Sequence, residues 1–157
     1  MRWAHATPTQ AAELLGELGA PEPAERALDR LARAAWSVLI EPGDAVAGML
    51  IAAHGPREAL ERAVTGDISG AGIDPEAQQA ALGRWRPRMA DTALESVLRV
   101  ARAARAQLLV PEDAAWPGAL ADLGPHMPVC LWARGVPEAL RRTAGTDWHV
   151  AELELAL

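Results

Sequence analysis

Lysine, phenylalanine and tyrosine are absent from this chain of 157 residues, and cysteine occurs only once. All fifteen basic side chains are therefore arginines, and six tryptophans must supply every large ring in the core. Because these arginines occur among many alanines, their number indicates biased coding DNA rather than selection for bidentate contacts. An arginine in this sequence is therefore weaker evidence of phosphate recognition than usual.

Two further absences narrow the class of protein. The single cysteine, Cys130, excludes an internal disulfide and cannot build a metal site alone. It lies in an apolar run, which favours a buried thiol. No stretch approaches the roughly 20 apolar residues of a membrane span, and residues 1–20 lack the apolar run of a signal peptide. We therefore expect a cytoplasmic protein without a membrane partner.

The overall composition is that of a folded domain. Hydrophobic residues make up 50% of the chain, which argues against disorder. The length suits one core, or one domain with a short appendage. The net charge of −6 disfavours nucleic-acid binding by the chain as a whole.

Helix signals dominate the first two thirds of the sequence and predict a mainly α fold, a small helical bundle. Thr7 and Gln10 have the spacing of a capping box, which predicts a helix to Leu18 with a left-handed stop at Gly19. Thr92 and Glu95 have the same spacing at the start of a later helix. Apolar steps of three and four and further cap signals predict helices over 24–39, 45–53, 57–64 and 74–85.

The two short predicted helices over 45–53 and 57–64 are joined by His54-Gly55-Pro56. Such an arrangement resembles a helix-hairpin-helix unit, whose glycine turn can present backbone N–H groups to a phosphate. Pro56 removes one of those donors. A plain helical hairpin is therefore the favoured interpretation of this turn.

Residues 106–136 have an order of features that a simple bundle does not need. Two short apolar runs, 108–110 and 129–133, predict strands. Between them come the acidic turn Glu112-Asp113, the pair Trp116-Pro117 and a helical turn over 118–123. This order predicts a short α/β connector, a strand–helix–strand unit.

The connector is expected to be anchored by large rings. A tryptophan before a proline is held extended and can fill an apolar gap. We expect the rings of Trp116 and Trp132 to pack between the bundle and the connector, with Pro117 and Gly135 shaping the backbone. Replacement of Trp116 by alanine would then cost roughly 3–5 kcal/mol.

The order of these motifs resembles the N-terminal part of the bacterial DNA-processing protein A (DprA) family. The resemblance is carried by Glu41-Pro42-Gly43-Asp44, His54-Gly55, Arg84-Trp85, and residues 110–123 with 128–135, within a match over about 25–136. It implies a sterile-alpha-motif-like bundle and a connector that, in the family, precedes a Rossmann-like domain. The implied function is handling of single-stranded DNA and loading of the recombinase in natural transformation.

The resemblance ends where the Rossmann-like domain of the family begins. The sequence contains no strand–Gly-x-Gly–helix unit. In the family, the main DNA groove, the dimer surface and the recombinase contact belong to that domain. We therefore expect a truncated or stand-alone N-terminal domain, accessory in function and not active alone. Its expected parts are an extension over 1–23, a bundle over 24–105, the connector over 106–136 and a divergent tail over 137–157.

One region is rich in arginine. Residues 84–105 contain six arginines against Asp91 and Glu95. Arginines with an interleaved tryptophan can contact a phosphate backbone and stack on a base. The favoured alternative is a solvated helix face with Trp85 turned into the core. The candidate nucleic-acid residues are Arg84, Trp85, Arg86, Arg88, Arg99 and Arg102.

Signals for catalysis are missing. The histidines are scattered without zinc-ligand spacing, and no serine lies in a nucleophile elbow. We therefore expect no enzyme activity, no cofactor and no metal. Two alternatives to the DNA-processing function stay open. One is a helical protein-interaction module that uses its exposed helical face and the acidic tail 147–157, whose apolar residues would favour dimerisation. The other is a small DNA-binding helical domain that uses the 84–105 face.

Overall fold

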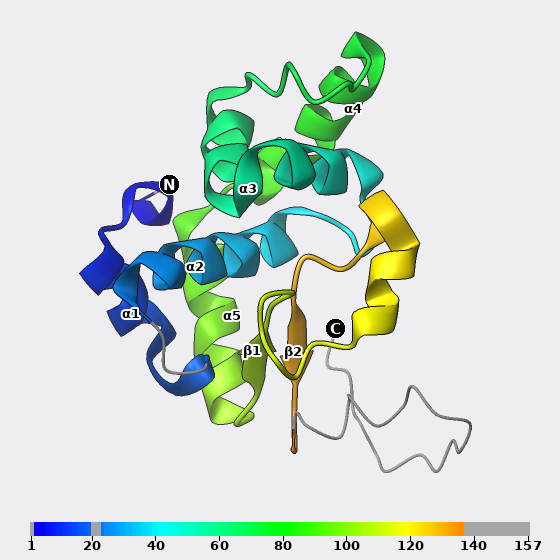
Figure 1. Cartoon of the computed structure of the whole chain (residues 1–157). Helices are drawn as coiled ribbons and strands as arrows, with labels where there is room; N and C mark the ends of the chain where they lie inside the picture. Colours follow the sequence, from blue (N-terminus) through cyan, green and yellow to red (C-terminus); the bar gives the residue numbers. More distant parts are fainter. Residues whose placement is uncertain (1, 20–22, 137–157) are drawn as a thin grey trace.

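Helix α2 (Ala24–Leu39) lies at the centre of the protein (Figure 1). The computed structural model describes residues 2–19 and 23–136. Residues 30–36 of α2 are buried without a break, so more than one face of the helix is covered. Its neighbours are α1 (Pro8–Leu15), α3 (Ala45–Thr65) and α5 (Asp91–Ala103). The rest of the chain is therefore built around this helix.

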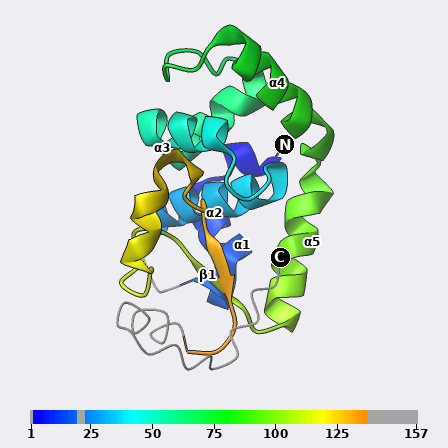
Figure 2. The same cartoon turned by 90° about the vertical axis from the view of Figure 1, so that its right-hand side faces the viewer.

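The fold is mainly α, a small helical bundle followed by a short connector, as predicted. Figure 2 shows α4 at one end of the molecule, with α5 and the connector on opposite sides of α2. The remaining bundle elements are η1 (Arg2–His5), η2 (Gly16–Leu18), α4 (Pro75–Trp85) and η3 (Arg86–Arg88).

Side-chain caps define several helix starts. Both halves of the Thr7–Gln10 capping box are present, and Asp44 accepts hydrogen bonds from the first amides of α3. Two predictions at helix ends are wrong. The first helix ends at Leu15, and the positive φ occurs at Gly16 (+52°) rather than at Gly19 (−121°).

The second wrong prediction is the Thr92–Glu95 capping box. Helix α5 begins after Ala90, which has no side-chain cap hydrogen bond. A box with Thr92 as the cap would satisfy the backbone amides of Thr92 and Glu95. Thr92 instead lies inside the helix, and the amide of Ala93 bonds to the carbonyl of Ala90 at 3.1 Å. A local backbone turn replaces the expected cap.

Helix α3 is two helices joined at a kink. Gly55 has φ +76° and ψ 162°, a conformation that residues with a Cβ rarely adopt. The following Pro56 is buried, and its carbonyl accepts the indole N–H of Trp36 at 3.0 Å. The predicted break at His54-Gly55-Pro56 is therefore present, and a core tryptophan holds it against α2.

The connector consists of two short strands and a 3-10 segment. Strand β1 (Gln107–Leu109) pairs antiparallel with β2 (Leu131–Ala133), with Leu108 opposite Trp132. Between them lies η4 (Gly118–His126), which is broken at Gly124 by a positive φ of 55°. The predicted order of strand, helical turn and strand is confirmed.

Two tryptophans form the centre of the core. Trp36 and Trp85 are fully buried, and their rings meet edge to face with centroids 5.2 Å apart. Trp36 comes from α2 and Trp85 from α4, so the contact joins two parts of the bundle. The predicted tail over 137–157, with its dimer surface, lies outside the described residues.

Candidate nucleic-acid interface

The arginine-rich region bends around one corner of the bundle. It runs from the end of α4 through η3 and along α5. Its exposed side chains are Arg84, Arg86, Arg88, Arg99 and Arg102. These are the basic residues that the sequence suggested for a phosphate backbone.

Trp85 does not take the role of a stacking platform. Its ring is fully buried against Trp36, and its indole N–H donates to an Asp44 carboxylate oxygen at 3.0 Å. The suggestion that Trp85 stacks on a base does not fit this conformation. The ring is buried because tryptophan is the only large ring type in the sequence and the core needs one at this position.

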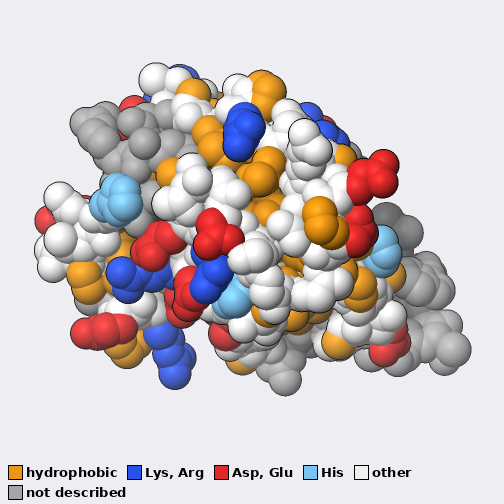
Figure 3. All heavy atoms as spheres, turned by 90° about the horizontal axis from the view of Figure 1, so that it is seen from above, with side chains coloured by type: hydrophobic (Ala, Val, Ile, Leu, Met, Phe, Trp, Pro, Cys, Tyr) orange, Lys and Arg blue, Asp and Glu red, His pale blue; other side chains and the backbone are white. Residues whose placement is uncertain are grey.

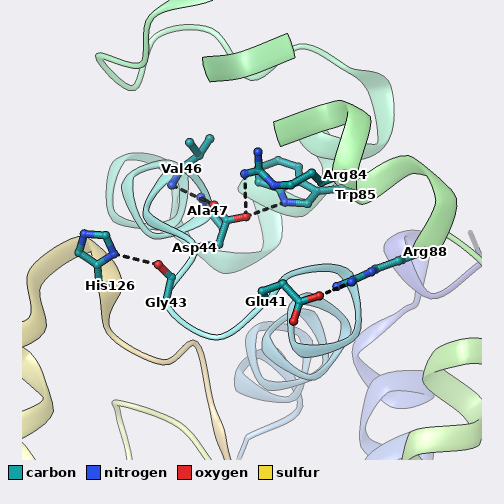
Figure 4. A network of polar contacts seen from close by, with 9 residues as sticks. All are labelled: Glu41, Gly43, Asp44, Val46, Ala47, Arg84, Trp85, Arg88 and His126. Atoms are coloured by element: carbon teal, nitrogen blue, oxygen red, sulfur yellow. Dashed lines mark hydrogen bonds and ion pairs between the residues drawn. The ribbon is translucent and has the colours of Figure 1, made fainter. Parts of the chain in front are cut away.

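Asp44 is the centre of a polar network at this corner (Figure 4). One carboxylate oxygen accepts the amides of Val46 and Ala47 at 3.1 and 3.2 Å. The other accepts Trp85 and the guanidinium of Arg84, the latter at 3.2 Å. Asp44 is 6% exposed and Arg84 54% exposed. One buried acid therefore caps α3, satisfies a core tryptophan and holds a surface arginine.

The same loop holds two further elements. Glu41 forms an ion pair with Arg88 of η3, and both side chains are exposed. The carbonyl of Gly43 is 2.8 Å from Nδ1 of His126 in η4. The loop over 41–44 therefore contacts η3 through an acid and the connector through its backbone (Figure 4).

The two arginines on α5 lie apart from the others. Arg102 donates to the backbone carbonyl of Leu14, and Arg99 to the hydroxyl of Ser96 at 3.2 Å. A helix rises about 1.5 Å per residue, so the last turn of α5 lies roughly 17 Å along the axis from its start. The predicted cluster is thus divided into a corner group, Arg84, Arg86 and Arg88, and a helix group, Arg99 and Arg102. Several of these arginines already donate hydrogen bonds to acceptors within the protein.

The surface near this corner carries charges of both signs. Figure 3 views the molecule from the side of α3 and α4, where acidic and basic side chains are intermingled and no continuous basic patch is seen. Acidic partners reduce the positive potential that a phosphate backbone would meet. This arrangement suits weak, salt-sensitive contacts rather than a strong binding groove.

The kink at Gly55 adjoins an open hollow of about 690 Å³. Arg57 and Arg62 line it, and each forms an ion pair with a glutamate of α3. Nε2 of His54 is buried without a hydrogen-bond partner among the described residues. The acidic residues of the lining are Asp29, Glu58, Glu61 and Asp67. Four acids against two arginines make a poor site for a phosphate, in agreement with the plain-hairpin interpretation.

Two buried arginines were not predicted from the sequence. Arg30 of α2 donates to both carboxylate oxygens of Asp113, at 2.7 and 2.6 Å, and to the carbonyl of Leu108 at 2.9 Å. Arg33 donates to Glu112 at 2.6 Å and to the carbonyl of Val129 at 3.2 Å. The available signal was the acidic pair itself, which the sequence indicated only as a turn.

The tryptophans of the connector differ in their surroundings. Trp132 packs against the core, and its indole N–H lies 3.4 Å from the hydroxyl of Ser37. Trp116 is only partly buried and is not among the described side chains that pack on the core. The prediction that both rings pack between the bundle and the connector fits Trp132, and the position of Trp116 outside the core set does not fit it.

The other connector residues have backbone roles. Pro117 precedes η4 and has no side-chain cap hydrogen bond. Gly135 has φ +100°, where a side chain would be strained. Cys130 is buried, and loss of water on burial raises the pKa of its thiol to about 12, against smaller opposing effects of Ser37 and Arg33. The thiol is therefore protonated and unreactive at neutral pH.

Within 2–19 and 23–136, no group of three or more His, Cys, Asp or Glu residues is arranged to hold a metal ion. None of the helices described there is both long and apolar enough to cross a bilayer. Comparisons with family models, curated proteins and solved structures found no match for this chain.

Proposed function

We propose that this chain acts as an N-terminal accessory domain of the DprA type, which helps to handle single-stranded DNA during natural transformation. The proposal starts from the resemblance of residues 25–136 to that family. It is supported by where the resembling motifs lie. The Glu41–Asp44 motif is the loop that caps α3, and His54-Gly55 is the kink of that helix.

The observation that carries the DNA contact is the exposed corner group, Arg84, Arg86 and Arg88. These arginines follow one another at the end of α4 and in η3, close enough to contact neighbouring phosphates of one strand. With Trp85 buried, binding would depend on charge and would not involve stacking by that ring. The net charge of −6 and the ion pairs at the corner keep it weak.

The test is a salt titration of single-strand binding, measured by the fluorescence anisotropy of a labelled oligothymidine with the full chain. We expect weak binding whose affinity falls steeply as salt rises. The triple variant Arg84→Ala, Arg86→Ala, Arg88→Ala should lose affinity. Its salt slope should become shallower by about two, since each phosphate contact on a single strand contributes about 0.7.

A matched control removes three arginines elsewhere. Arg26, Arg57 and Arg62 lie on α2 and α3, and their replacement by alanine changes the net charge by the same amount. If this control lowers affinity as much as the corner variant does, binding follows net charge and no interface exists. An unchanged salt slope in the corner variant would also refute the proposed contact.

The resemblance also implies a recombinase as a partner of the family. In the family its contact belongs to the Rossmann-like domain, and no residue of this chain matches that part. We therefore expect this chain to leave recombinase filament assembly on single-stranded DNA unchanged. If the chain alone stimulated filament assembly, its role would not be merely accessory, and this part of the proposal would be wrong.

A further inference from the structure

One side of α2 is turned toward the connector. Arg30, Arg33 and Ser37 are spaced by three and four residues, so they lie along one face of the helix. All three have partners in the connector, namely Asp113, Glu112 and Trp132 respectively. Arg30 and Arg33 are 3% and 7% exposed. The contact between α2 and the connector therefore includes two buried guanidinium groups, in addition to its apolar packing.

A second contact holds the connector on α3. Pro125 of η4 lies so close to Gly48 that a Cβ built on this glycine would be 1.9 Å from the Pro125 carbonyl oxygen. Only glycine allows this approach. The next residue, His126, bonds to the carbonyl of Gly43. The 3-10 segment is thus held at one end by a notch in α3 and by the loop before it.

The connector is too small to be stable away from these contacts. Each of its strands has three residues, and a two-stranded sheet is marginal in water without a surface to pack on. Its buried residues, among them Leu108, Val110 and Val129, pack in the same core as the bundle residues. Loss of one contact with the bundle should therefore loosen the others.

From these contacts we infer that the connector is a strap that opens from the bundle as one cooperative unit, latched by the Arg30–Asp113 pair. Separation of the pair would take from the buried Arg30 guanidinium the carboxylate that accepts two of its hydrogen bonds, which is unfavourable. The contact between Trp36 and Trp85 does not involve this pair or any connector residue, so it can persist when the connector opens. Such a sub-global unit opens at a lower free energy than the whole fold. The inference does not rest on the proposed function.

The test is native-state amide hydrogen exchange on the full chain, read separately for each element. In Asp113→Asn, the amides of β1 and β2 should exchange about 100-fold faster than in the natural protein, since a broken buried pair is costly. The slowest amides of α3 and α4 should still exchange more slowly than those of the strands, by the same factor as in the natural protein, because loss of the pair lowers the free energies of connector opening and of global unfolding alike. Glu41→Gln is the matched control, because it removes a carboxylate from an exposed pair and should leave all elements unchanged.

A second variant perturbs the other contact of the connector, the one between α3 and η4. Gly48→Ala pushes against Pro125 without touching either arginine, and it should accelerate exchange in both strands to a similar degree in each. If Asp113→Asn fails to fold, this variant still decides the question. Acceleration confined to η4 would show that the connector does not open as a unit. One common exchange rate for the strands and the slowest α3 and α4 amides in the natural protein, or no acceleration of the strands in either variant, would likewise overturn the inference.

Discussion

In the bundle, Trp36 and Trp85 meet edge to face and each donates its indole N–H to an oxygen of a neighbouring element. In the connector, by contrast, the decisive contacts are the guanidinium groups of Arg30 and Arg33 on a pair of acids. The first region is held chiefly by apolar burial, with polar groups satisfied at its edge. The second is held to α2 by directional charge pairs on short segments.

The difference matters for how each region fails. Apolar burial is not directional, so a core loses stability in proportion to the surface removed and partly relaxes around a change. A buried ion pair depends on geometry, and the loss of one partner leaves the charge of the other buried without compensation. The connector should therefore respond sharply to isosteric changes of charge, and the bundle to changes of volume.

The largest expected effect is in the bundle. Trp85→Ala removes a fully buried ring and leaves Asp44 without one of its donors, so the free energy of unfolding should fall by about 3–5 kcal/mol. Urea unfolding followed by circular dichroism measures this. A loss below about 1 kcal/mol would show that the ring is not central to the core.

The next effect depends on pH and concerns the connector. Burial raises the pKa of Asp113, but the hydrogen bonds from Arg30 and from the Val110 amide, with the charge of Arg30, lower it more, so the net pKa lies below 3.8. Its contribution to stability is complete above the unfolded-state pKa and is lost as the pH falls through the lower folded-state value. Asp113→Asn should cost about 3 kcal/mol at pH 7.

This pH effect is measured as a difference between two proteins. Urea midpoints of the natural protein and of Asp113→Asn should differ at pH 7 and at pH 5 by similar amounts. The difference should narrow below pH 3.8. A constant difference down to pH 2.5 would mean that the charge of the Asp113 carboxylate contributes nothing to the free energy of unfolding.

A smaller effect separates the two tryptophans of the connector. Trp132→Ala removes a ring that packs on the core, and we expect a loss of about 2–3 kcal/mol. Trp116→Ala removes a partly exposed ring and should cost about 1 kcal/mol. Thermal melts of the two variants under the same conditions give the order. The reverse order would show that the ring of Trp116, and not that of Trp132, contributes more to the packing between the bundle and the connector.

The smallest expected effect is at the exposed corner. Glu41→Gln breaks the pair with Arg88, whose partners are 68% and 43% exposed, so stability should change by less than about 0.5 kcal/mol. The same chemical change at Asp113 is expected to be several times larger. If the two changes cost the same, burial does not distinguish the two ion pairs and the comparison between them fails.

The helical part of the fold could be predicted in detail because its signals are local. The apolar spacing within 24–39 and the aspartates before α3 and α4 act on residues within one or two turns. The end of the first helix was predicted wrongly, since Gly16 and Gly19 are equally good local stops. The buried Leu18 is reached by a 3-10 turn instead of a longer helix.

The candidate site was predictable only as a set of residue types. The arginines at 84–88 are evident in the sequence, but their acidic partners Glu41 and Asp44 lie about forty positions earlier. Likewise, Arg30 is paired with Asp113, 83 positions away. No local rule connects side chains at such separations, so the sign of the charge around each arginine depends on the packing.

The sequence by itself determined where helices begin, where α3 is kinked, and that two short strands flank a proline-bounded segment. Hydrogen bonding and apolar periodicity over a few residues are sufficient for that. The sequence also favoured a buried Trp85, but the tertiary structure alone decided that its ring meets Trp36, that Trp132 and not Trp116 packs on the core, and that two arginines of α2 hold the connector. These outcomes depend on which surfaces meet, and a buried guanidinium is stable only where the fold places a carboxylate and carbonyl oxygens around it.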